Sequence, residues 1–389
     1  METNKPVRFG IIGIGNMGGA HMRCLASGKI RGAVLTCVCD NDPAKESRAV
    51  PGVPFFGDYR ELLKSGLADA VLIAVPHWLH PQIAIDAFAA GCHVLTEKPA
   101  GVRQSDVLQM NAAAKMSGKC FGIMWNQRTN PLFQKARELV QSGAIGQRKR
   151  LVWIVTNWYR PQNYYDSGTW RATWSGEGGG VLMNQAPHNL DLMQWIFGMP
   201  DEVAAHCDEG KWHRIEVEDD VVINGFYKDG ATAAFLTSTG EYPGTNRLEI
   251  SGSRGRIVIE KGTLTSTLYD RDEREFCFTD PAEYPNELPD SPVLTQTEPE
   301  PAHAGILQNF TDHILFGAPL LAPGEEGIRE ITLANAAYLS SWTGERIRTD
   351  NFDAERFNAL LAEKISNSRV KTAPLTSEVP DAARWRTKW

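Results

Sequence analysis

Length, composition and charge already exclude several classes of protein for this 389-residue chain. It holds 40 basic and 47 acidic residues, a formal charge of −7, without a long basic cluster, which argues against a nucleic-acid partner. We see no apolar run near the roughly 18 to 20 residues of a membrane helix, and no signal peptide at the amino terminus. At roughly 100 to 200 residues per domain, the length predicts two domains.

The seven cysteines are odd in number. Most lie in apolar segments, and none forms a Cys-x-x-Cys pair. This usage is typical of buried thiols in a reducing compartment, so we expect a cytoplasmic protein.

The first part of the chain alternates strands with helices. Residues 7–13 are apolar and β-branched, and they lead through a glycine-rich turn into a helix over 19–27. Further strands are predicted at 33–39, 69–75 and 93–96, with a helix over 81–90 that begins at a proline. Residues 1–124 therefore predict a doubly wound parallel sheet of the α/β class.

The second part has a different pattern. A helix over 132–141 is followed by longer strand-like runs, at 149–156, 217–226, 231–238, 247–251 and 256–260. Helical patterning returns at 304–315 and 325–341, after an acidic, proline-rich stretch over 270–302 that we expect to be an exposed arm. We predict an α+β domain over 125–350 with a large, mostly antiparallel open sheet, and a carboxy-terminal extension over 351–389.

The glycine turn has the pattern GxGxxG between a strand and a helix. Gly13 allows the tight turn, Gly15 lets a pyrophosphate approach the backbone, and Gly18 permits close packing of helix on strand. The amides that open the helix, around Asn16 and Met17, are donors for the phosphates. The context predicts a dinucleotide-binding Rossmann domain.

Asp40 ends the second predicted strand, 22 residues after Gly18. A carboxylate there accepts hydrogen bonds from the adenosine ribose hydroxyls and repels a 2′-phosphate, which favours NAD over NADP. Asp42 is the alternative ribose ligand, because it lies only two residues further on.

A second motif, Thr96-Glu97-Lys98-Pro99, follows another predicted strand, at the sheet edge where such folds bind ligands. Beside a cationic nicotinamide and away from water, the neutral form of Lys98 is favoured, so Lys98 can accept a hydroxyl proton. On the tripeptide alone, a surface ion pair between Glu97 and Lys98 is the simpler interpretation.

A distant glycine-rich motif favours the catalytic role of Lys98 over the surface ion pair. With GIIGIGNMG, VPHWLHPQIAIDAFAAGCHVLTEKPA and IGQRKRL, the segment GGGVLMNQAPHNLDL makes the chain resemble the Gfo/Idh/MocA oxidoreductases, named after glucose–fructose oxidoreductase and inositol dehydrogenase. The resemblance covers about the first 350 residues. It implies that Lys98 is the catalytic base, that Glu97 belongs to the cofactor side, and that His188 assists catalysis.

The residue four before His188, commonly an aspartate in the family, is Asn184 here. An amide can orient a sugar hydroxyl but cannot relay a proton, so Lys98 and His188 would share the acid–base chemistry. On one continuous helix, Asn184 and His188 would lie at i and i+4 and share a face.

Other segments supply further candidates. The resemblance places Pro76 and His77 beside the nicotinamide, and Trp125, Asn126 and Arg128 along the substrate cleft. We expect His80 to be a structural hydrogen-bonding residue, and we expect no metal site, because the histidines of this region lie on separate segments.

Seven aromatic residues gather between 153 and 174, interleaved with arginines. Some must belong to the core, but a Tyr/Trp/Arg loop is typical of a pocket that stacks on sugar C–H faces and binds hydroxyls or an acidic group. The substrate-binding candidates in this loop are Arg160, Tyr164, Tyr165, Trp170 and Arg171.

These features predict an NAD-dependent oxidoreductase that acts on a secondary hydroxyl of a sugar, glycoside or cyclitol. Two alternatives remain: an NAD-dependent glycosidase that oxidises, eliminates, adds water and reduces, and a nucleotide-sensing protein without turnover. The resemblance also implies a homodimer or homotetramer, because the open sheet leaves one apolar face that needs a partner.

Overall fold

The computed structural model describes residues 5–282, 291–296 and 300–369, which group into two compact units. Unit 1 lies within Met1–Thr129 and Glu300–Ile331, and unit 2 within Asn130–Pro299 and Thr332–Trp389. This division differs from the predicted domain limits, because residues 300–331 return to unit 1. There Phe310 packs against Phe9, with ring centroids 6.3 Å apart, and over Gly122.

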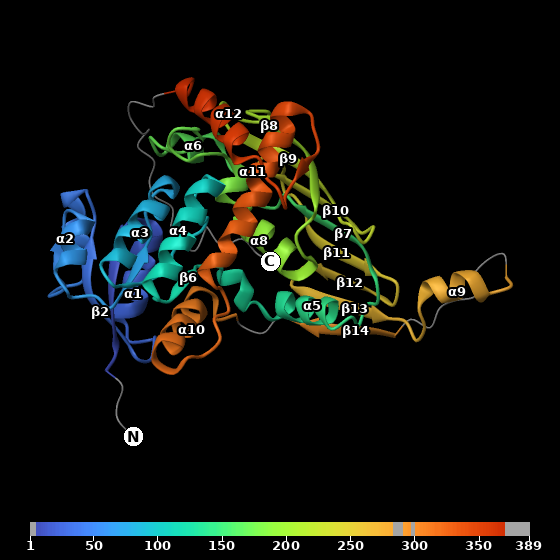
Figure 1. Ribbon diagram of the computed structural model, residues 1–389, viewed down its shortest axis with the longest axis horizontal. Helices are drawn as coiled ribbons and strands as arrows, with labels where there is room; N and C mark the ends of the chain where they lie inside the picture. The colour runs from blue at the N-terminus through green and yellow to red at the C-terminus, as the bar shows by residue number, and fades with distance from the viewer. Residues whose placement is uncertain (1–4, 283–290, 297–299, 370–389) are drawn as a thin grey trace. The chain divides into compact units, whose positions relative to one another are not determined.

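Unit 1 is built on a six-stranded sheet in the order β3-β2-β1-β4-β5-β6, parallel at every pair (Figure 1). Its strands are β1 (Val7–Ile12), β2 (Ala33–Cys39), β3 (Phe55–Phe56), β4 (Ala70–Ile73), β5 (His93–Thr96) and β6 (Phe121–Ile123). The α-helices that lie wholly in unit 1 are α1 (Asn16–Ala26), α2 (Tyr59–Lys64), α3 (His80–Ala89), α4 (Gln104–Ser117) and α10 (Ala302–Phe316).

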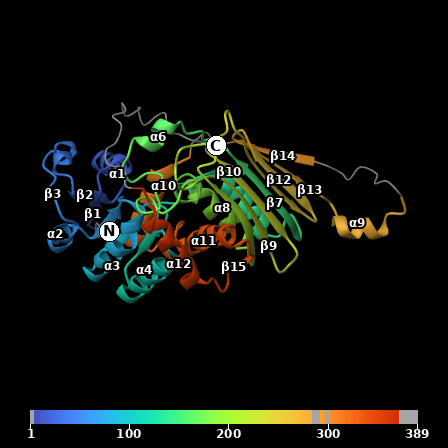
Figure 2. The ribbon, with the colours of Figure 1, turned by 90° about the horizontal axis from the view of Figure 1, so that it is seen from above.

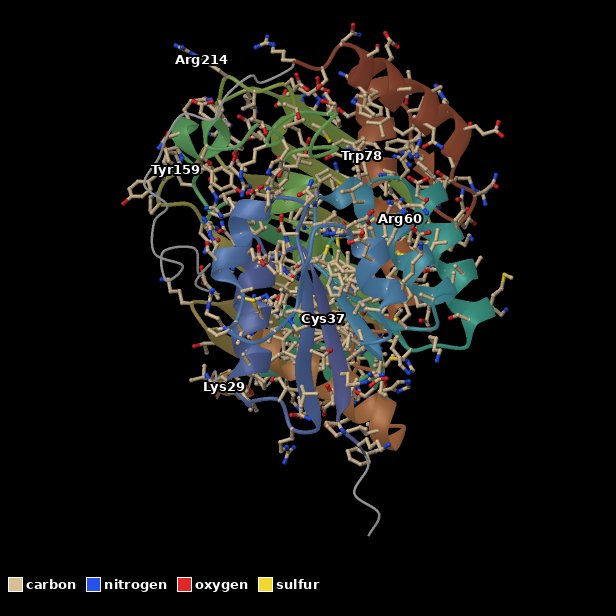
Figure 3. The ribbon with its side chains drawn as sticks, turned by 90° about the vertical axis from the view of Figure 1, so that its left-hand side faces the viewer. Lys29, Cys37, Arg60, Trp78, Tyr159 and Arg214 are labelled. Carbon is tan, nitrogen blue, oxygen red and sulfur yellow. The ribbon has the colours of Figure 1, made fainter. Side chains whose placement is uncertain are left out.

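The doubly wound parallel sheet is confirmed. Every residue of β4 is buried, as expected of a parallel strand covered on both faces. The side chain of Cys37 lies within this sheet (Figure 3). The first helix begins at Asn16, inside the glycine motif, instead of at Gly19.

Unit 2 contains a nine-stranded sheet, counted over the described residues, in the order β14-β13-β12-β11-β7-β10-β9-β8-β15. All its pairs are antiparallel except β10 with β7, so the predicted, mostly antiparallel sheet is confirmed. The strands are β7 (Arg148–Val155), β8 (Glu202–Glu209), β9 (Glu218–Phe226), β10 (Thr232–Ser238), β11 (Asn246–Gly252), β12 (Gly255–Glu260), β13 (Thr263–Leu268), β14 (Ser291–Gln296) and β15 (Ile347–Arg348).

One face of this sheet carries the core of unit 2. Buried and partly exposed positions alternate along β7 and β10, and Trp153 meets Phe235 edge-to-face with ring centroids 6.2 Å apart. Figure 2 shows helices along one side of the sheet. The α-helices that lie wholly or partly in unit 2 are α5 (Pro131–Gln141), α6 (Gln162–Asp166), α7 (Val181–Asn184), α8 (Pro187–Phe197), α9 (Glu273–Thr279), α11 (Gly327–Thr343) and α12 (Ala354–Ser366).

The expected arm over 270–302 is only partly an excursion. Figure 1 shows α9 beyond the β13–β14 end of the sheet, and Phe278 on α9 is 81% exposed. Residues 291–296, however, form β14 and pair with β13, so they belong to the sheet. Residues 283–290 and 297–299 of the arm, and 370–389 of the predicted extension, lie outside the described residues. Among the described helices, none combines the length and apolarity that crossing a bilayer requires.

Candidate active site

The glycine turn has the backbone geometry of a phosphate-binding loop. Gly13 has φ +89°, and a Cβ on Gly18 would lie 1.8 Å from the carbonyl oxygen of Gly13, so both positions require glycine. A Cβ on Gly15 would meet nothing within 4 Å, which leaves that side of the loop open to a ligand. Because α1 begins at Asn16, its first amides face this opening and fit a pyrophosphate.

Asp40 is held against this loop. Its Oδ2 accepts a hydrogen bond from Ile14 N at 2.9 Å, and Lys45 Nζ lies 3.0 Å from both carboxylate oxygens. Asp42 instead caps the 3₁₀ helix η1 (Pro43–Arg48) by accepting from Ala44 N. Of the two aspartates, Asp40 therefore remains the predicted ribose ligand. Lys45 carried no signal in the sequence beyond its charge.

Glu97 is the centre of a buried network in unit 1. Its Oε1 lies 2.7 Å from His21 Nε2 on α1, and its Oε2 accepts from Lys98 N at 3.2 Å. The ring of His303, on α10, lies 5.5 Å from that of His21. Burial alone would raise the pKa of the Glu97 carboxyl, but the hydrogen bond and charge of His21 lower it to about 2.

This network rules out the simpler interpretation of the Glu97-Lys98 pair. Glu97 is buried and bound to His21, so it is not half of a surface ion pair. His21 and His303 were missed by sequence reasoning, because neither lies in a motif that singles it out. Burial lowers the pKa of His303 to about 4, which keeps that imidazole neutral beside the network at pH 7.

His80 joins the two turns that follow β4 and β5. Its Nδ1 lies 2.8 Å from the Pro99 carbonyl oxygen and its Nε2 2.9 Å from that of Val75. Burial lowers the pKa of this imidazole. The predicted structural role of His80 is confirmed, and the bonds fix the turn that carries Pro76 and His77.

The neighbouring Trp78, labelled in Figure 3, packs against Arg103. The guanidinium carbon lies 5.6 Å from the centroid of the Trp78 ring.

The three candidates after β6 are buried in unit 1. Trp125 and Asn126 keep their place as predictions. Arg128 differs, because its guanidinium binds Glu326 at 2.5 Å and the Leu321 carbonyl oxygen at 3.1 Å. These contacts give Arg128 a structural role, since an arginine held by a carboxylate inside a domain stabilises that domain, and its substrate contact stays a prediction.

In unit 2, the segment with Asn184 and His188 is not one helix. Asn184 ends α7, and His188 is the second residue of α8, which begins at Pro187. Proline has no N–H to continue the hydrogen-bond ladder, so the helix breaks before it. The expectation of an i, i+4 pair on one continuous helix is therefore wrong.

Asn184 lies in a polar cluster formed by the aromatic loop and α7. Its Nδ2 donates to Glu177 Oε1 and lies 3.3 Å from the Tyr164 hydroxyl. Arg171 donates to the same hydroxyl at 2.8 Å. The guanidinium carbons of Arg160 and Arg171 lie 5.1 and 4.7 Å from the Tyr164 ring centroid. The structure thus gathers four of the predicted residues, and adds Glu177.

The rest of the aromatic loop divides between core and surface. Tyr165 is buried in unit 2, with its hydroxyl 2.7 Å from Thr239 Oγ1 and its ring against His213, and its substrate contact stays a prediction. Trp170 stacks with Arg171, with 4.7 Å from guanidinium carbon to ring centroid. Tyr159 points away from the ribbon (Figure 3).

A second buried carboxyl supports the start of α7. Glu218 accepts hydrogen bonds from Gly180 N, Leu182 N and the Tyr338 hydroxyl. Burial raises the pKa of Glu218 to about 8, although these three donors act in the opposite direction. Over the part of the chain that is described, no three or more His, Cys, Asp or Glu residues are grouped to hold a metal ion.

A glycine-loop α/β unit with a buried aspartate held against the loop, followed by an α+β unit with a mostly antiparallel sheet, is typical of an NAD-binding oxidoreductase. Comparison with known families agrees. Residues 7–124 match the model described as "Oxidoreductase family, NAD-binding Rossmann fold", and residues 133–258 match "GFO/IDH/MocA C-terminal domain". The chain belongs to the Gfo/Idh/MocA oxidoreductase family, as its motifs predict.

Two relatives of modest identity are dehydrogenases by name. The chain is 27% identical over 345 residues to myo-inositol 2-dehydrogenase of Thermotoga maritima, covering 85% of this chain and 95% of that one. It is 30% identical over 254 residues to 1-carboxy-3-chloro-3,4-dihydroxycyclohexa-1,5-diene dehydrogenase of Comamonas testosteroni, covering 63% and 61%.

A solved structure resembles the whole fold. It is the WlbA dehydrogenase of Bordetella pertussis in complex with NADH and UDP-GlcNAcA, with a TM-score of 0.73 and 28% identity, covering 88% of this chain and 98% of that one. NAD is accordingly the cofactor of this protein.

Proposed function

We propose that this protein oxidises a secondary hydroxyl on the ring of a sugar, glycoside or cyclitol and transfers the hydride to NAD. The observation that carries the proposal is that Lys98 follows β5 at the ligand-binding edge of the NAD unit, anchored through Glu97 to the cofactor helix α1. Unit 2 of the same chain presents a polar and aromatic cluster around Asn184, suited to a hydroxylated ring.

Each of these residues has a separate part in the reaction. Bound NAD supplies the hydride acceptor. Lys98 accepts the hydroxyl proton while the hydrogen on the same carbon leaves as hydride with two electrons, so the alcohol loses two protons and two electrons in all and becomes a ketone. His188 assists this proton transfer, and Asn184 orients the ring through a hydrogen bond to a hydroxyl.

Arg160 and Arg171 favour a substrate that also carries an acidic group. Both guanidinium groups lie against Tyr164, and Arg171 also binds its hydroxyl, so two positive charges border the Asn184 cluster. Arginine is suited to binding carboxylates through paired hydrogen bonds. The Comamonas relative, by its name, acts on a ring that bears a carboxy group and two hydroxyls, which agrees with this choice.

The test is a panel of ring alcohols with NAD, read at the absorbance of NADH. The panel contains myo-inositol, glucose and glucuronate, so that neutral and acidic rings are compared directly. We expect NADH formation, faster with glucuronate than with glucose. NAD binding without NADH from any member of a wider panel would instead support the nucleotide-sensing alternative.

We also propose that the protein is a cytoplasmic homodimer or homotetramer. All seven cysteines are free, as suits a reducing compartment. Val152, Ile154 and Leu236 remain partly exposed on the sheet face opposite Trp153 and Phe235, and a second copy would cover them. Light scattering of the purified protein measures the number of copies, and a monomer at micromolar concentration would contradict this proposal.

A further inference from the structure

We propose that Glu177 is a positioning residue that fixes the orientation of the Asn184 amide, the group proposed to hold a substrate hydroxyl. The role of Asn184 towards substrate rests on the proposed function, whereas the pairing of the two side chains does not. Nothing in the motifs singles out Glu177, which precedes the run of three glycines before α7.

The contacts of Glu177 leave its orientation no freedom. The residue is buried, with 2% of its surface exposed. Its Oε1 accepts from Asn184 Nδ2, and its Oε2 accepts from Ala172 N at 2.7 Å. Both carboxylate oxygens are therefore bound, one to α7 and the other to the aromatic loop.

This arrangement decides which way the Asn184 amide points. An ionised carboxylate only accepts hydrogen bonds, so the atom of Asn184 that faces Glu177 must be the NH₂ group. The second hydrogen of that group is directed to the Tyr164 hydroxyl, 3.3 Å away. The amide oxygen Oδ1 is therefore on the side of the amide away from Glu177, and as an acceptor it can bind only a donor, such as a hydroxyl.

Glu177 also holds the loop that carries the arginines. Ala172 has φ +52°, a left-handed conformation that costs a residue with a Cβ roughly 1 kcal/mol or more. Its amide is the one bound by Glu177, directly after Trp170 and Arg171. One carboxylate thus fixes both the amide of Asn184 and the backbone beside Arg171.

The pair explains why asparagine is compatible with this chain at position 184. An aspartate there would place a second carboxylate against Glu177, and two adjacent carboxylates cannot both ionise without a large rise in the pKa of one. An acid at 177 requires a donor at 184. If the roles are exchanged, with an amide at 177 and an acid at 184, the hydrogen bond is restored in the opposite sense.

The experiment compares Glu177→Gln, Asn184→Asp and the double variant Glu177→Gln/Asn184→Asp with the wild type. Glu345→Gln is the matched control, because it neutralises an exposed carboxylate of unit 2 that pairs with Arg356. Thermal unfolding midpoints are measured from pH 5 to pH 8 without substrate. We expect Asn184→Asp to lose stability relative to the wild type as the pH rises, and the double variant and the control to follow the wild type.

The second readout separates positioning from a merely structural role. With glucuronate or myo-inositol as the probe, whichever the wild type turns over faster, Glu177→Gln should raise KM about tenfold, the equivalent of about 1.4 kcal/mol. KM rises because a glutamine at 177 allows either orientation of the Asn184 amide. The Kd for NAD should stay unchanged, because the glycine loop and Asp40 belong to unit 1 and Glu177 to unit 2. The double variant should recover part of the lost kcat/KM.

Two results would overturn the pairing: the same pH profile for Asn184→Asp as for the wild type, or a double variant as unstable at pH 8 as Asn184→Asp. An unchanged KM in Glu177→Gln would overturn the positioning role. A wild type without turnover, combined with the expected pH profiles, would refute the proposed function and the role of the pair in substrate binding, but it would support the Glu177–Asn184 pair itself.

Discussion

Lys45 Nζ lies 3.0 Å from both carboxylate oxygens of Asp40, and Asp40 in turn accepts from Ile14 N in the glycine loop. The lysine neutralises a buried carboxylate, and the loop amide fixes its direction. Groups of the protein itself thus hold the carboxylate that we propose as the ribose ligand, and single substitutions can measure its contribution to NAD affinity.

Asp40→Ser should weaken NAD binding at least tenfold and relax the preference for NAD over NADP. Two hydrogen bonds to a charged acceptor are lost, each contributing about 1.5–3 kcal/mol, and the repulsion of a 2′-phosphate disappears. Titration calorimetry with both cofactors gives the ratio of Kd values. Asp42→Ser is the control, because Asp42 caps η1. A wild type that binds NADP as tightly as NAD would contradict the assignment.

His21→Phe should destabilise the protein by about 1.5–3 kcal/mol, because it leaves the buried Glu97 carboxylate without its imidazole donor. Urea unfolding of His21→Phe, Glu97→Gln and the double variant forms a double-mutant cycle. The costs should be far from additive, since both single changes break the same hydrogen bond. Additivity within about 0.5 kcal/mol would show that the two residues are energetically independent.

Much of unit 1 was predictable from local sequence. The bounds of β2 and β5 follow from apolar runs that end at Asp40 and Glu97, and the glycine spacing fixes the phosphate loop. The return of 300–331 to unit 1 was not predictable, because it depends on Phe310 packing against residues far away in the chain. The roles of His21 and Glu177 were not predictable either, because the fold alone brings them into contact with Glu97 and Asn184.

The break between α7 and α8 is different, since its cause is visible in the sequence. Pro187 interrupts the segment between Asn184 and His188, but the family spacing suggested a continuous helix. The helix-breaking effect of Pro187 predicts this boundary better than the family spacing does. For Arg128, motif position suggested the substrate cleft, whereas the buried contact with Glu326 could be seen only in three dimensions.

Glu218 should make the protein less stable as the pH rises from about 4.5 towards about 8. Its pKa is raised in the folded state, so between these values the folded state keeps a proton that the unfolded state has released. Each pH unit in this window costs at most about 1.4 kcal/mol. Thermal unfolding should show a steeper loss in the wild type than in Glu218→Gln. Parallel profiles for the two proteins would contradict a raised pKa.

Lys98→Met should keep the fold and NAD binding but slow hydride transfer by about 10²- to 10⁴-fold, since only the proton acceptor is removed. His188→Ala should fall in or below that range. Stopped-flow measurement of NADH formation separates the chemical step from cofactor binding. Turnover near the wild-type rate in Lys98→Met would remove Lys98 from the catalytic role.

The redox stoichiometry of the wild-type enzyme tests the central claim most directly. A dehydrogenase releases one NADH for each alcohol oxidised, whereas a glycosidase that oxidises and then reduces returns the hydride and needs only trace NAD. We would quantify NADH by absorbance and the ketone or free sugar by chromatography in the same reaction, with free sugars and their methyl glycosides as substrates. The account predicts equal amounts of NADH and ketone with an intact glycosidic bond. Free sugar released from the glycoside with catalytic NAD and no net NADH would contradict it.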